Sequence, residues 1–151
     1  MELKGKRIVK SDPATLWKML MDAEILPKIV PGISKLEKTG ENTYKSVMEV
    51  KFGPIGGEFT GDMQMGDIIY QKSFTLKAQQ HNKIGTVNSS MKIELMPLAV
   101  NETEVAFGGE VTISGLMSVM GQNLLGGVAD MLTKQFFANL DHEIAKQQAG
   151  R

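Results

Sequence analysis

The side chains that most often act as acids, bases or metal ligands are thinly spread along this chain. It holds two histidines and no cysteine. His81 follows an alternating stretch and is expected in a turn, whereas His142 lies near the end of a predicted C-terminal helix, between Asp141 and Glu143. A cation near a helix C-terminus is favourable by itself, and consecutive helical residues point in different directions. We therefore predict no metal site and no catalytic histidine.

The carboxylates of the predicted strands all fall at the alternate positions that are expected to face outward from the sheet. They are Glu49, Glu58, Asp62, Glu94, Glu104 and Glu110. General acid–base catalysis needs such a group positioned at the reacting atoms, and no inward pair of carboxylates is present. We therefore predict a protein that is not an enzyme and that uses no cofactor.

A few polar residues fall at the alternate strand positions that are expected to face inward, toward the core. They are Arg7, Ser46, Lys72 and Ser89. Arg7 or Lys72 could orient a carbonyl or carboxylate head group in an otherwise apolar pocket, or could simply be solvated at its rim. Both interpretations stay open on the sequence.

Composition excludes several classes of protein. Lysine plus arginine equals aspartate plus glutamate at 17 each, so the basic surplus of a nucleic-acid binder is missing. The lack of cysteine rules out disulfides, thiolate zinc sites and a cysteine nucleophile. No signal-peptide core occurs at the start, and Gly121, Gly126, Gly127 and Asp130 interrupt the C-terminal helix as a membrane span. We expect a single domain, residues 1–151, in the cytoplasm.

Methionine is unusually common, at 11 residues against 6 phenylalanines. Methionine is unbranched and polarisable, so it adapts to irregular space and to variable apolar ligands. The excess indicates either plain replacement of leucine in the core or a deformable pocket.

Alternation and breaker residues predict an α+β fold. Strands are expected at residues 2–10, 33–38, 44–52, 59–65, 70–79, 87–95 and 105–113, and helices at 13–21, 23–29 and 115–146. The breaks between strands fall at residues 53–57, at Gly66-Asp67 and at 96–101. Six successive strands with short connections favour an antiparallel meander. We predict a curved sheet of about seven strands wrapped around the long C-terminal helix, with two short helices between strands one and two.

The apolar inward positions define a candidate binding cavity between this sheet and the helix. Its predicted ligand-binding residues are Leu26, Val30, Met48, Val50, Phe52, Phe59, Met63, Phe74, Leu76, Met91, Ile93, Phe107, Met117, Met120 and Leu124. The mouth is expected at Leu26, Val30, Phe52 and Ile55. Because the glycines thin the first half of the C-terminal helix, binding is expected against that half, and residues 129–140 are expected to be ordinary packing around Phe136 and Phe137.

Several segments together resemble a known family. They are MELKG at the start, Trp17 in the first helix, DAEILPKIVPG at 22–32, KLEKTGENTY at 35–44, VKFGPIGGEFTGDM at 50–63 and GGVADMLTKQFF at 126–137. The order of elements is similar to the helix-grip fold of the START-like (SRPBCC) superfamily. The segments themselves resemble the CoxG family, named for the G subunit of carbon monoxide dehydrogenase, over nearly the whole chain.

This resemblance implies binding of a hydrophobic molecule, such as a lipid, an isoprenoid or a quinone, between sheet and helix. Family members occur in operons for molybdenum carbon monoxide dehydrogenases, where they are implicated in membrane recruitment and in handling lipophilic quinones. A molybdenum hydroxylase-type dehydrogenase and a membrane surface are thus the implied partners, with peripheral membrane attachment as one location. Members encoded with the dehydrogenase often carry a C-terminal extension for attachment, which does not follow Arg151 in this sequence.

Two further hypotheses compete with a carrier of hydrophobic molecules. A cyclase or aromatase, which the superfamily also contains, requires a buried acid, base or hydroxyl pair facing the cavity. A recruitment or assembly factor requires a contiguous exposed apolar patch, for which Ile29, Val30 and Ile55 are the candidates.

Overall fold

The computed structural model describes residues 1–52, 55–115 and 122–150, with the side chains of 52, 55, 56 and 122–125 left out. Along the chain the elements are β1 (Glu2–Val9), α1 (Pro13–Leu20), α2 (Leu26–Ile29), β2 (Ile33–Gly40), β3 (Thr43–Phe52), β4 (Ile55–Ile69), β5 (Ser73–Asn82), β6 (Gly85–Ala99), β7 (Glu102–Ser114) and α3 (Gln122–Ala149). The predicted α+β order of seven strands, two early helices and one long C-terminal helix is confirmed.

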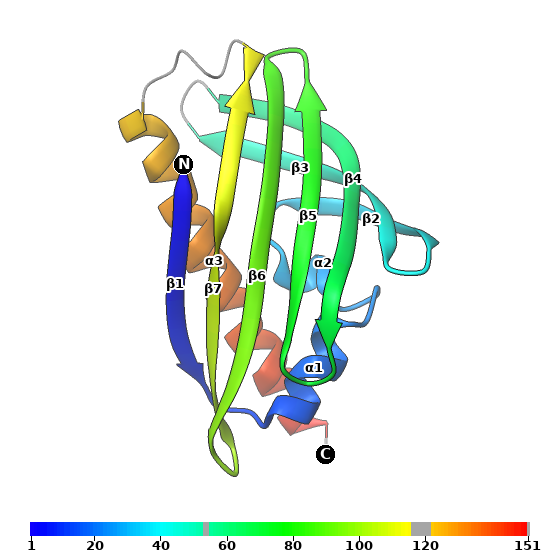
Figure 1. The fold of residues 1–151 in the computed structure, drawn as a ribbon, viewed down its shortest axis with the longest axis vertical. Helices are drawn as coiled ribbons and strands as arrows, with labels where there is room; N and C mark the ends of the chain where they lie inside the picture. The colour runs from blue at the N-terminus through cyan, green and yellow to red at the C-terminus, as the bar shows by residue number, and fades with distance from the viewer. Residues whose placement is uncertain (53–54, 116–121, 151) are drawn as a thin grey trace.

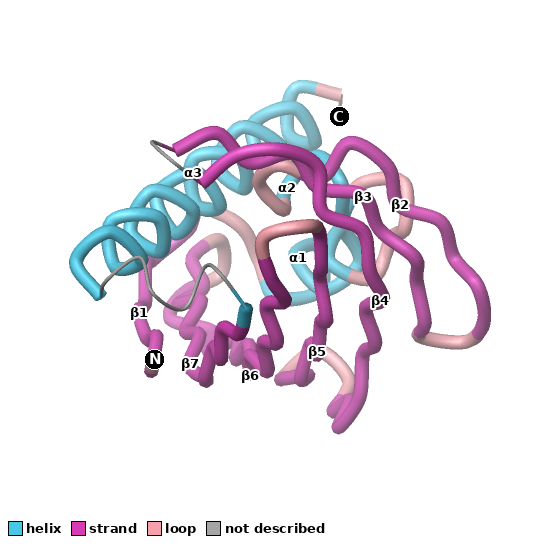
Figure 2. Tube along the Cα trace, turned by 90° about the horizontal axis from the view of Figure 1, so that it is seen from above, coloured by secondary structure: helices cyan, strands magenta, loops and turns pink. Residues whose placement is uncertain are grey.

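The strands form one antiparallel sheet in the order β1-β7-β6-β5-β4-β3-β2. Each strand from β2 to β7 pairs with its sequence neighbour, and β1 closes the other edge beside β7. The sheet is curved, and α3 runs across its open side (Figures 1 and 2). The concave face of the sheet and α3 therefore face each other, and the side chains between them decide whether a cavity remains.

Two glycines permit close backbone approach inside this curved sheet. A Cβ atom at Gly61 would lie 1.7 Å from the carbonyl oxygen of Gln79, and one at Gly109 would lie 1.9 Å from that of Ser90. No other residue fits at such a distance, so glycine in these strand interiors marks where neighbouring backbone crowds the face.

The short helices form from local capping signals. The Asp12 carboxylate accepts a hydrogen bond from the Thr15 amide at 3.0 Å, and Pro13 occupies the first turn of α1. Trp17 on α1 packs edge-on against Phe74 at 5.8 Å between ring centroids. Helix α2 is shorter than predicted because the Asp22 carboxylate bonds the Glu24 amide at 2.9 Å and turns the chain before Leu26.

Several predicted strand boundaries are wrong. Strand β4 begins at Ile55, inside the predicted break at 53–57, β5 begins at Ser73 rather than at 70, and β7 begins at Glu102 rather than at 105. Strand β4 continues past Gly66 to Ile69 because Asp67 adopts a positive φ of 50° and the pairing register shifts there. Strand β6 continues past Pro97 to Ala99 with another register shift. His81 lies within β5 rather than in a turn. An irregularity absorbs one residue without ending a strand, so breaker residues here bend the strand instead of terminating it.

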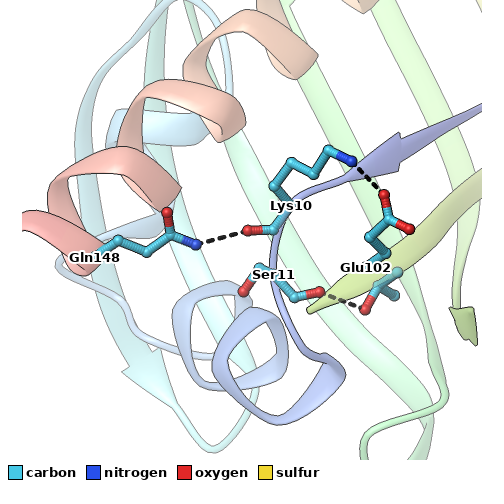
Figure 3. A network of polar contacts seen from close by, with 5 residues as sticks. Lys10, Ser11, Glu102 and Gln148 are labelled. Atoms are coloured by element: carbon cyan, nitrogen blue, oxygen red, sulfur yellow. Dashed lines mark hydrogen bonds and ion pairs between the residues drawn. The ribbon is translucent and has the colours of Figure 1, made fainter. Parts of the chain in front are cut away.

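Helix α3 is anchored to the rest of the molecule at its C-terminal end. Leu140 and Ile144 are buried in the core, and Asn139 donates from Nδ2 to the Ile29 carbonyl oxygen at 3.1 Å. Gln148 donates from Nε2 to the Lys10 carbonyl oxygen at 2.7 Å (Figure 3). These contacts fasten the helix to α2 and to the segment that links β1 with α1.

The β1–α1 link is also tied to β7. The Thr103 hydroxyl donates to the Ser11 carbonyl oxygen at 2.7 Å, and Lys10 forms an ion pair with Glu102 (Figure 3). Thr103 is fully buried, so its hydroxyl needs this partner. The link therefore holds three elements, β7, α1 and α3, in one arrangement.

Candidate functional site

A cavity of about 350 Å³ lies between the concave face of the sheet and α3. Most strands contribute to its wall, as does the middle of α3. The lining residues are Met1, Leu3, Val30, Met48, Val50, Phe59, Met63, Leu76, Ala78, Gln80, Val87, Ser89, Met91, Ile93, Phe107, Val111, Ile113, Val128, Ala129, Leu132, Thr133 and Phe136. This volume lies at the lower end of the range typical of small-molecule sites.

Strand register explains why these side chains share one face. Met48 pairs with Phe59 across β3 and β4, and Met63 pairs with Ala78 across β4 and β5. Ala78 in turn pairs with Ser89 on β6. Since residues paired in register project to the same side of a sheet, the alternation predicted along each strand becomes a continuous apolar wall.

Most of the predicted ligand-binding residues lie on the cavity wall. These are Val30, Met48, Val50, Phe59, Met63, Leu76, Met91, Ile93 and Phe107. Leu26 and Phe74 instead lie in the core, at 3% and 2% exposure, and do not line the cavity. The side chains of Phe52, Ile55 and Leu124, together with Met117 and Met120, lie outside the described residues.

The wall also contains residues outside the predicted ligand-binding set, among them Ser89, which was predicted to face inward. Ala78, Gln80, Val87, Ser89, Val111 and Ile113 all follow the inward parity of their strands, and extending the Phe74-Leu76-Ala78 series by one step would have found Gln80. On α3, the described lining residues are Val128, Ala129, Leu132, Thr133 and Phe136. The expectation that 129–140 would be packing alone is therefore wrong, since Phe136 lines the cavity while Phe137 is buried.

Arg7 and Lys72 do not reach the cavity. Arg7 lies near the end of β1, where its guanidinium pairs with the Asp141 carboxylate at 2.8 Å and sits 5.9 Å from the Phe137 ring centroid. Lys72 lies in the exposed turn before β5. Neither side chain can therefore orient a head group inside the cavity. Of the two interpretations that the sequence left open for these residues, the head-group role is excluded.

The polar side chains on the described cavity wall are neutral. Gln80, Ser89 and Thr133 line it, and the remaining lining side chains in the described part of the chain are apolar. Gln80 is 6% exposed and donates from Nε2 to the Ser46 hydroxyl at 2.6 Å. The Gln80 amide oxygen is buried with no hydrogen-bond partner among the described residues. Such an atom is uncommon, because buried polar groups are nearly always paired.

Apart from the amino group of Met1, ionisable groups lie away from the described cavity wall. Met1 lines one end, and its amino group donates to the Val111 carbonyl oxygen at 2.8 Å. Tyr44 is buried and does not line the cavity, and burial raises the pKa of its phenol above the ordinary value. Both histidines are exposed, and His81 lies 3.5 Å from the Thr60 hydroxyl. Within residues 1–52, 55–115 and 122–150, no three metal-ligating side chains gather.

Comparison with known proteins identifies the family. The CoxG family, that of the carbon monoxide dehydrogenase G subunit, matches residues 5–145. The chain belongs to this family. No curated protein matches the sequence. In the described ranges, no helix has the length and apolar character needed to cross a membrane.

Solved structures with the same fold include members of the START superfamily. A conserved protein from Geobacillus kaustophilus is 29% identical with a TM-score of 0.92, covering 97% of this chain and 96% of its own. A START superfamily protein from Mycobacterium smegmatis is 11% identical with a TM-score of 0.71, covering 97% and 98%. An aromatase/cyclase, Zhui, from a Streptomyces species is 12% identical with a TM-score of 0.73, covering 97% and 94%. The last two show the helix-grip fold alone.

Proposed function

We propose that this protein binds a hydrophobic small molecule, such as a lipid, an isoprenoid or a quinone, in the cavity between the sheet and α3, without converting it chemically. The observation that carries the proposal is the apolar cavity of about 350 Å³. Protein interiors are normally packed with few voids larger than a water molecule. A hollow core of this kind, built by strands that pair in regular register, favours a binding role over a defect of packing.

The chemistry of the wall supports binding rather than catalysis. Acid–base or nucleophilic catalysis requires a base within hydrogen-bond reach of the reacting group. The polar side chains of the described wall are an amide and two hydroxyls, with Ser46 behind the amide. A hydroxyl without a neighbouring base is a weak nucleophile. This arrangement is unfavourable for a cyclase or aromatase, although the fold is shared with one.

Ligand content can be measured directly on purified protein. We expect solvent extraction and native mass spectrometry to reveal a bound apolar molecule. Ser89→Phe should lower its occupancy by about tenfold or more, because the ring enters the cavity from the middle of β6 and filled space excludes the ligand. The matched control is Ser90→Phe, which places the same ring on the exposed face of the same strand.

The outcome of this comparison is decisive in either direction. Equal loss of ligand in both variants would assign the effect to general disturbance of β6. Protein that contains no ligand, and that takes up none when offered quinones or fatty alcohols, would overturn the proposal.

Exposed apolar residues favour recruitment as a second function. Ile68, Ile69 and Tyr70 at the end of β4, and Met96, Leu98 and Val100 at the end of β6, are all exposed. The β4–β5 turn and the β6–β7 hairpin lie at the same end of the molecule (Figure 1). The patch predicted around Ile29 is wrong, since Ile29 is fully buried. Co-purification of a molybdenum-containing dehydrogenase that is lost on changing Leu98 and Val100 to serine would support this role.

A further inference from the structure

The Gln80–Ser46 hydrogen bond at the cavity wall is built across three strands. Ser46 on β3 pairs with Gly61 on β4, and Gly61 pairs with Gln80 on β5. Gly61 has no side chain, so the Gln80 amide passes over it to reach the Ser46 hydroxyl at 2.6 Å. Val87 on β6 pairs with Gln80, and Ser89 lies two residues after Val87 on the same face of that strand. The amide is thus held at a defined place on an otherwise apolar wall.

This pair has hydrogen-bonding capacity that the described residues do not use. With Nε2 donating to Ser46, the amide oxygen remains an acceptor and the Ser46 hydroxyl remains a donor. Rotating the amide by half a turn exchanges the roles: Ser46 then donates to the oxygen and the amide N–H groups are left over. Both orientations leave a donor and an acceptor available, and neither supplies a charge.

From these observations we propose that Gln80, oriented by Ser46, is the head-group contact that selects ligands ending in a neutral oxygen, a hydroxyl or a carbonyl, over ligands ending in a carboxylate. The inference rests on the proposed function, since it names the class of molecule bound in the same cavity. A hydroxyl or carbonyl finds a complementary partner in the pair. A carboxylate would lose its hydration with no lysine or arginine side chain on the described wall to compensate. The cation of the wall, the Met1 amino group, already donates to the Val111 carbonyl oxygen.

The test uses three probes with the same aromatic body: naphthalene, a naphthol and the matching naphthoate. Binding to the ligand-stripped full chain is measured by equilibrium dialysis at a pH where the naphthoate is ionised and the naphthol is neutral. We expect the naphthol to bind most tightly and the naphthoate most weakly. Gln80→Leu should lower the affinity for the naphthol by roughly twofold to tenfold, and leave the affinity for naphthalene unchanged or higher.

Gln79→Leu is the matched control, because Gln79 is the exposed neighbour on the same strand and receives the same substitution. It should leave all three affinities unchanged. Gln80→Met serves as a second apolar replacement if Gln80→Leu does not fold. A merely structural role of Gln80 would change the affinities for naphthol and naphthalene by the same factor.

The possible results separate this inference from the proposed function. If naphthol and naphthalene bind but their affinity ratio is the same in the wild type and in Gln80→Leu, the head-group assignment is overturned and the cavity function stands. If the naphthoate binds as tightly as the naphthol, the assignment also fails. If none of the probes binds, the head-group assignment is overturned, and the cavity function falls as well only if extraction also finds no bound molecule and no quinone or fatty alcohol is taken up.

Discussion

Gly61 determines whether Gln80 can reach Ser46. A side chain at this position would lie between the two on the same face of the sheet, and a Cβ atom would already lie 1.7 Å from the Gln79 carbonyl oxygen. Space for even one methyl group is therefore missing. The same residue both lets the backbone of β4 and β5 approach and leaves the gap that the Gln80 amide crosses.

At this residue, Gly61→Ala should lower the free energy of unfolding by about 3 kcal/mol or more, since the clash is with backbone that cannot rotate away. Urea denaturation followed by circular dichroism measures the change. The control is Gly66→Ala in the same strand, where nothing lies within 4 Å of the added methyl group. A loss of similar size in both variants would mean that flexibility of glycine, not the close approach, explains the effect.

At the scale of elements, one part of α3 lines the cavity and the following part packs in the core. Val128, Leu132 and Phe136 recur at helical spacing and line the cavity. Phe137, Leu140 and Ile144 follow the same spacing on the neighbouring face and are buried. The C-terminal part of α3 therefore anchors the helix in the core, whereas the residues from Val128 to Phe136 line the cavity. The element that closes the core is thereby also a wall of the cavity.

For this element, Leu140→Ala should cost about 2–5 kcal/mol of unfolding free energy, because a fully buried side chain is removed from a packed site. Leu98→Ala, on the exposed end of β6, should change it by about 0.5 kcal/mol or less. Thermal and urea denaturation both report the difference. Equal effects would show that α3 does not depend on this anchor.

Which elements the chain forms could be predicted from alternation and helical spacing, whereas several boundaries could not. The end of β4 is an example: Gly66-Asp67 has the composition of a turn, yet the strand continues to Ile69 because Asp67 takes a positive φ within the pairing. The face of α3 is another. The sequence interpretation assigned both Phe136 and Phe137 to ordinary packing, and only docking on the sheet placed one at the cavity and the other in the core.

At the scale of the whole molecule, the cavity makes stability depend on its occupant. A ligand that binds only the folded state stabilises it by about 2.7 kcal/mol at a concentration of 100 times its Kd. The cavity lies between the described sheet and α3, so loss of the ligand acts on the packing of both.

We therefore expect the Tm of ligand-loaded protein to exceed that of solvent-stripped protein by about 5–10 °C. Differential scanning fluorimetry before and after extraction measures the shift. The Ser89→Phe variant should show almost none, because its cavity is already filled. A Tm that does not respond to extraction in the wild type would argue that any co-purifying molecule binds elsewhere.

The sequence by itself determined the order of elements, the parity of each strand and most of the apolar wall, because alternation and helical spacing are local properties of neighbouring residues. Family membership followed from segments spread along the chain. Only the tertiary structure decided that Gln80 meets Ser46, since that contact depends on how β3, β4 and β5 align and on the empty position at Gly61. Pairing register is a long-range property, set by the packing of the whole sheet rather than by any one strand.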